Sequence, residues 1–125
     1  MAADFGEAFA ALKKVSAKHS AKLAVKTDTA EEYSLEGRVA SPFPQHKGHP
    51  MWFSAVKVGK AYVSFHLTPL YMNPALDKYI TADLRKRMQG KACFNFKLAL
   101  EEAVLRELDE LIVVAIKDWS AKGWL

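Results

Sequence analysis

The sequence predicts an α+β domain in which the N- and C-terminal helices pack on one face of a mainly antiparallel sheet. Apolar residues recur at helical spacing near both ends of the chain, whereas short central segments alternate between apolar and polar residues as strands do. These segments follow one another without the regular strand–helix alternation of a parallel sheet. The 125 residues suit a single domain, 1–125, with one core.

The first element is an amphipathic helix over residues 4–19, and the alternating segments 22–26 and 33–39 follow as a hairpin. Residues 41–50 contain three prolines and Gly48, so they cannot hold a strand ladder. We expect this segment to be a loop.

The central hairpin has Gly59–Lys60 as its predicted two-residue turn, since glycine adopts a positive φ at little cost. This turn pairs Val58 with Ala61 and sets which residues face the core. It also pairs Val56 with Val63, Ser54 with Phe65, and Trp52 with Leu67.

Three further elements complete the chain. Pro74 is well placed to open a short helix over about 74–88, which Gly90 ends, before the last strand at 92–97. The longest helix spans about 99–121, with acidic residues in its first turn and lysines near its end, as the helix dipole favours. We expect a core of Trp52, Val56, Val63, Phe65, Phe94, Phe96, Leu108 and Leu111.

The segment Leu111–Ile116 is apolar on almost every side of that last helix, which is more than one contact face requires. Either a second element of the chain or a partner chain must cover it. Together with the apolar tail Trp124–Leu125, which we expect to be exposed, this predicts a homodimer.

The net charge is +4, and the basic excess lies in the middle, where residues 31–98 hold ten Lys and Arg against five Asp and Glu. Nucleic-acid domains concentrate charge more strongly, and Arg85–Arg87 suits a solvated helix end, so we expect no nucleic-acid partner. The lone Cys93 excludes an intramolecular disulfide and a cysteine-based zinc site. No membrane span or signal peptide is evident, which predicts a cytoplasmic protein.

The side of the sheet that faces away from the core is the predicted binding site, because polar and aromatic side chains alternate outward on neighbouring strands. Such a face can bind an anionic or planar aromatic ligand. The alternative is that the 74–88 helix covers this face. The candidate ligand-binding residues are Phe53, Lys57, Tyr62, Ser64, His66, Cys93, Asn95 and Lys97.

Two chemical alternatives involve cysteine and histidine. Cys93 beside His66, with Asn95 to orient the pair, would be the minimum of a thiol nucleophile site in which the imidazole lowers the thiol pKa. The motifs of serine hydrolases and nucleotide-binding loops are absent, so we lean towards a non-enzymatic protein. His46 and His49 lie in a proline-rich loop that lacks a ligand scaffold, and we expect neither metal nor cofactor.

One stretch resembles a known family. Gly59–Lys60, Tyr62–Leu67, Tyr71, Pro74 and Lys86–Lys91, followed by a phenylalanine-containing strand, are similar to the YdhG-like domains of bacteria. That resemblance implies an α+β fold like that of the frataxins, and it adds little chemistry because the family is mostly without an assigned activity.

Frataxin-like shape raises an iron-handling chaperone as an alternative function. Frataxins carry an acidic ridge on the first helix and the adjoining strand, whereas the first helix here offers Asp4 and Glu7 and then lysines, which would repel iron. These lysines are Lys13, Lys14, Lys18 and Lys22. The sequence therefore predicts a small-ligand or protein-binding module of the YdhG-like type.

Overall fold

The computed structural model describes residues 2–90, 92–97 and 100–125 and shows a five-stranded antiparallel sheet in the order β1-β2-β3-β4-β5. The strands are β1 (Ala24–Asp28), β2 (Glu32–Glu36), β3 (Trp52–Val58), β4 (Val63–Leu67) and β5 (Cys93–Phe96). The α-helices are α1 (Ala2–Ala17), α2 (Thr68–Met72), α3 (Ala82–Arg85) and α4 (Glu102–Ala121), and the 3-10 turns are η1 (Ser20–Lys22), η2 (Pro44–His46) and η3 (Pro74–Tyr79).

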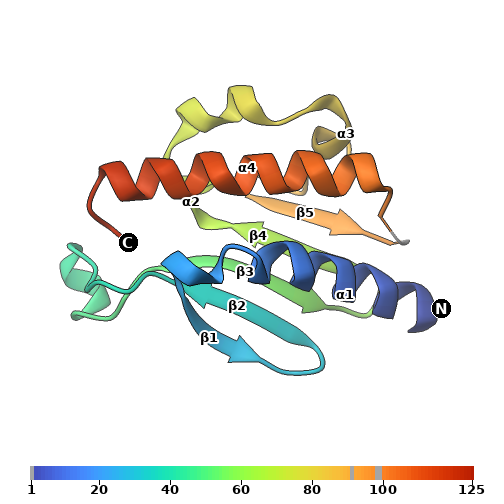
Figure 1. Ribbon diagram of the computed structural model, residues 1–125, viewed down its shortest axis with the longest axis horizontal. Helices are drawn as coiled ribbons and strands as arrows, with labels where there is room; N and C mark the ends of the chain where they lie inside the picture. Colours follow the sequence, from blue (N-terminus) through green and yellow to red (C-terminus); the bar gives the residue numbers. More distant parts are fainter. Residues whose placement is uncertain (1, 91, 98–99) are drawn as a thin grey trace.

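Helices α1 and α4 lie side by side over one face of the sheet, as Figure 1 shows. The core lies between these two helices and the sheet. The predicted fold class is therefore confirmed. None of the helices in the described part of the chain is both long and apolar enough to cross a bilayer.

The predicted helix over 74–88 exists as two shorter pieces. Ile80 is extended after η3, and the Thr81 hydroxyl accepts a hydrogen bond from the Leu84 N–H, so that α3 begins anew at a threonine N-cap. Beyond α3 the chain runs beside β5, where Asn95 N–H donates to the Arg87 carbonyl at 2.8 Å and Gln89 N–H donates to the Cys93 carbonyl at 2.8 Å. This segment covers part of the edge of β5 that does not pair with β4.

The predicted pairing of the central hairpin is wrong by two residues. Val58 pairs with Val63, and the turn is Lys60–Ala61, closed by a hydrogen bond from Gly59 N–H to the Tyr62 carbonyl at 2.9 Å. Gly59 does not have a positive φ. A Cβ there would lie 3.0 Å from the Tyr62 carbonyl oxygen, so glycine favours this close approach of the two backbone segments. A two-residue shift keeps the alternation, and Val63, Phe65 and Leu67 still face the core.

Trp52 and Phe53 have exchanged their predicted sides. Trp52 is 41% exposed, whereas Phe53 is 0% exposed and meets the Trp119 ring edge-on at 5.4 Å. The β2–β3 register shifts at this point, since Leu35 pairs with Ser54 and the next β2 residue pairs with Trp52. Phe53 is therefore the extra residue of a β-bulge, which turns it inward. The other expected core residues are buried: Val56, Val63, Phe65, Phe94, Phe96, Leu108 and Leu111.

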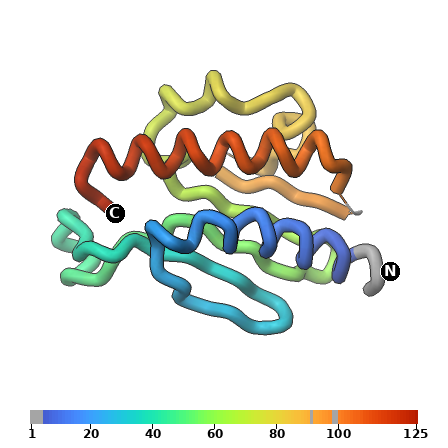
Figure 2. The backbone as a smooth tube through the Cα atoms, in the orientation of Figure 1, coloured from blue at the N-terminus to red at the C-terminus, as the bar shows by residue number. Residues whose placement is uncertain are grey.

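The apolar segment of α4 is covered within the chain. Leu111, Ile112, Ala115 and Ile116 are buried and Val113 and Val114 are half-buried, because α1 packs against α4 on one side and η3 and α3 on the other. The expected exposure of the C-terminal tail is wrong. Trp124 meets Trp119 and Phe43 at 5.7 Å between ring centres, and Figure 2 shows the C-terminus beside the 41–50 loop. One chain thus accounts for the observations that suggested a homodimer.

Candidate ligand-binding face

The side of the sheet opposite α1 and α4, called the outer face below, carries five of the predicted site residues in two adjacent rows. Lys57 pairs with Ser64, which pairs with Asn95, and in the next row His66 pairs with Cys93. Directly paired residues of neighbouring strands project to the same side. All five are half-buried, so they form a partly accessible polar surface on a rigid scaffold.

Cys93, on the edge strand β5, lies close to two other residues of this surface. Its Sγ is 3.8 Å from His66 Nε2 and 3.7 Å from Asn95 Oδ1. Burial raises the pKa of the Cys93 thiol, and burial followed by the charge of Lys57 lowers the pKa of the His66 imidazole. The thiol therefore stays protonated and the imidazole neutral near pH 7. This is the reverse of the lowered thiol pKa that a nucleophile site requires.

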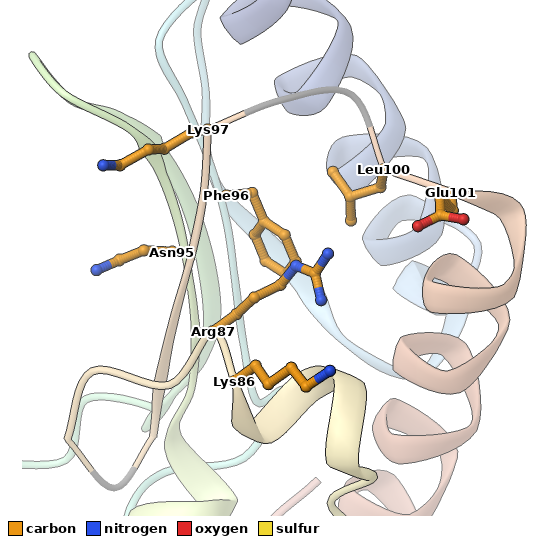
Figure 3. A pocket seen from close by; sticks show the side chains of 7 residues that line it. All are labelled: Lys86, Arg87, Asn95, Phe96, Lys97, Leu100 and Glu101. Carbon is orange, nitrogen blue, oxygen red and sulfur yellow. The ribbon is translucent and has the colours of Figure 1, made fainter.

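The remaining predicted site residues lie outside these two rows. Tyr62 closes the hairpin turn, and Lys97 follows the end of β5. In Figure 3, Asn95 and Lys97 point to one side of β5 while Phe96 points to the other, as strand alternation requires. Phe53 was wrongly assigned to this face, because the bulge turns it into the core.

Two aromatic residues that the sequence analysis missed complete the face. Trp52 and Tyr71, which are 41% and 63% exposed, border a surface hollow of about 300 Å³ that we call the Trp52–Tyr71 hollow. The ammonium groups of Lys57 and Lys26 lie 4.8 and 5.7 Å from the centre of the Trp52 ring. The hollow is lined by Trp52, Lys57, His66, Thr68, Tyr71 and Ala92.

A larger hollow, of about 540 Å³, lies between β5 and the start of α4 (Figure 3). Its central cation already has a hydrogen-bond partner, because the Arg87 guanidinium donates to the Asp83 carbonyl at 2.8 Å; it also lies 5.8 Å from the Phe96 ring centre. Glu101 places a carboxylate in the same hollow. We therefore assign Arg87 a structural role and prefer the outer face as the site.

The loop histidines are not brought together with other metal ligands. Within residues 2–90, 92–97 and 100–125 no group of three or more His, Cys, Asp or Glu side chains could hold a metal ion. His46 Nδ1 instead lies 2.6 Å from the Ser41 hydroxyl, which orders the loop.

No protein-family model, no curated protein and no solved structure matches this chain. We therefore infer its function from the outer face.

The half-buried His66 makes the free energy of unfolding depend on pH. Because its folded pKa lies below the ordinary 6.5, the unfolded chain binds the proton first. The stability that neutral His66 contributes is complete above about pH 6.5, and it is lost as the pH falls through 6.5 towards the pKa of the folded protein. We expect the free energy of unfolding, measured in urea, to decrease in this window.

His66→Gln should flatten that decrease. Burial alone would raise the pKa of the Asp109 carboxyl, but hydrogen bonds from Lys18 and His19 outweigh burial and lower that pKa. The loss of stability linked to Asp109 therefore falls in a separate window, below pH 3.8. An unchanged pH profile between neutral pH and about 5 in the variant would contradict the assignment to His66.

Proposed function

We propose that this protein is a non-enzymatic module that binds a small anionic or planar aromatic ligand on the outer face. The observation that carries the proposal is the Trp52–Tyr71 hollow, in which two exposed aromatic rings stand beside a lysine and a neutral histidine. The rings provide stacking surface. Lys57 provides a positive charge, and Thr68 and His66 provide hydrogen-bonding groups that fix orientation.

The charge of the outer face favours a small ligand over a polymer. Glu32 pairs with Lys57 and Glu36 pairs with Trp52, so two carboxylates of β2 lie on the same side of the sheet. They would repel the successive phosphates of a nucleic acid laid across the strands. Neither Glu32 nor Glu36 lines the Trp52–Tyr71 hollow, so a compact ligand held in the hollow places no further negative charge across β2.

Membership of the YdhG-like family and a cytoplasmic location belong to the same proposal. The α+β fold is compatible with that family, and the free Cys93 suits a reducing compartment. An iron-handling role is disfavoured by Lys13 and Lys14 on α1 and by Lys18 just after its end. A thiol enzyme is disfavoured because the Cys93 and His66 pair is neutral, although the two side chains do touch.

Backbone amide shifts of isotope-labelled protein test the proposal. The protein is titrated with a panel of nucleoside monophosphates and aromatic carboxylates, and separately with Fe²⁺ and Zn²⁺. We expect at least one organic anion to produce saturable shifts centred on Trp52, Lys57, His66 and Tyr71. Saturable shifts confined to His46 and His49 on adding metal would instead support the iron-handling alternative.

Two exposed tyrosines provide a matched pair of variants. Tyr71→Ala removes one border of the hollow, whereas Tyr79→Ala removes a comparably exposed ring on η3. Only Tyr71→Ala should weaken binding. Equal loss in both variants would contradict a site at the hollow.

A further inference from the structure

A second hollow adjoins the first at Trp52. It has a volume of about 330 Å³ and lies between the 41–50 loop, the start of β3 and α2. We call it the Phe43–Met72 hollow. Trp52 and Thr68 line both hollows, so the two hollows are neighbours on the surface.

The two hollows differ in chemistry. Lys57 and His66 line the first, whereas among the described residues that line the second there is no Lys, Arg, Asp or Glu. Its lining includes the Phe43 ring and the side chains of Met51 and Met72, together with the polar residues Gln45, His46 and Thr68. The apolar part of this surface gains free energy by covering apolar groups, and the described lining residues include no lysine or arginine to bind a second anionic group.

The apolar hollow combines a fixed wall with adaptable ones. The Phe43 ring meets the Trp124 and His46 rings edge-on, each at 5.7 Å, which fixes its position. Met51 is almost fully buried and Met72 is half-buried. Unbranched methionine side chains adjust their shape to differently sized apolar groups.

We propose that the ligand class is an amphiphile, with a planar anionic head in the Trp52–Tyr71 hollow and an apolar tail that passes Trp52 into the Phe43–Met72 hollow. This inference rests on the proposed function, since the head uses the same site. Charge complementarity places the anion at Lys57, and the shared lining residues place the tail in the uncharged hollow. The tail distinguishes this class from a nucleoside monophosphate, which is polar at both ends.

A series of benzoates tests the proposal by isothermal titration calorimetry and amide shifts. Benzoate and its para-methyl, para-ethyl and para-butyl derivatives share one head and differ only in tail length. Affinity should rise about fourfold for each methylene that enters the apolar hollow. The longer members should also shift the amides of Phe43, Met51 and Met72.

Two methionine variants separate the tail site from general apolar attraction. Met72→Gln keeps the side-chain length but adds a polar group in the hollow, so it should flatten the dependence on tail length and leave benzoate affinity unchanged. Met88→Gln makes the same change at a half-buried methionine of a different hollow, lined by Leu70, Pro74 and Met88. It should leave the whole series unaffected.

The possible failures are distinguishable. If benzoate binds at Lys57 but affinity does not change with tail length, the amphiphile class is refuted while the proposed function stands. If the neutral para-butyl benzyl alcohol binds as tightly as para-butyl benzoate, the anionic head is refuted. If neither the series nor the nucleotide panel shifts the outer face, both proposals fail together.

Discussion

Phe53→Ala is expected to lower the free energy of unfolding by about 3–5 kcal/mol, the cost of removing a fully buried aromatic side chain. The ring is 0% exposed and packs edge-on against Trp119, which is itself fully buried. Phe65→Ala, on the core side of β4, should cost a similar amount and provides the reference. Urea unfolding of the variants gives the comparison.

Trp52→Ala is the matched control, because Trp52 precedes Phe53 directly but lies on the outer face. We expect it to cost about 1 kcal/mol or less, as exposed substitutions do. A larger loss for Trp52→Ala than for Phe53→Ala would mean that the bulge is absent and that the strand keeps regular alternation. A loss below about 1 kcal/mol for Phe65→Ala would mean that the hairpin faces are inverted.

The same Trp52→Ala variant should strongly impair binding. Stacking of a planar group on an aromatic side chain contributes about 1–3 kcal/mol by alanine substitution, which corresponds to a loss of about 5- to 150-fold in affinity. The expected combination is a folded, stable protein that binds the best ligand of the panel at least fivefold more weakly. Calorimetric titration measures it.

Lys57→Met tests the charge at the same place, since it keeps most of the side-chain length and removes the ammonium group. Affinity for anionic ligands should fall, and its dependence on salt should weaken. Lys60→Met, at the exposed hairpin turn, is the control. Equal effects of both substitutions would show that the protein attracts anions through its net charge and has no defined site.

Alternation along β4 and β5 was sufficient to predict much of the outer face. Ser64, His66, Cys93 and Asn95 occupy regular strands, and period-2 patterning assigns their side correctly whatever the pairing register. The same argument failed at Trp52 and Phe53, because the bulge depends on how β3 pairs with β2, and sequence alternation within β3 does not contain that information.

Other differences have local causes. Tyr71 lies on α2, beyond the end of β4, so strand patterning says nothing about where its ring lies. The break in the 74–88 helix did have a sequence signal, because Thr81 is a favourable N-cap residue ahead of Ala82–Arg85. The predicted hairpin turn was misplaced because the prediction gave Gly59 a positive φ inside the turn. In the structure Gly59 precedes the turn, where it allows a close backbone approach.

Intermolecular nuclear Overhauser effects between the tightest ligand of the panel and the protein test the binding site most directly. The proposal predicts contacts from the ligand ring to the Trp52 indole and the Tyr71 ring, with further contacts to the His66 imidazole. Contacts confined to Phe96 and Arg87, in the hollow beside α4, or to the loop histidines, would contradict a ligand site on the outer face.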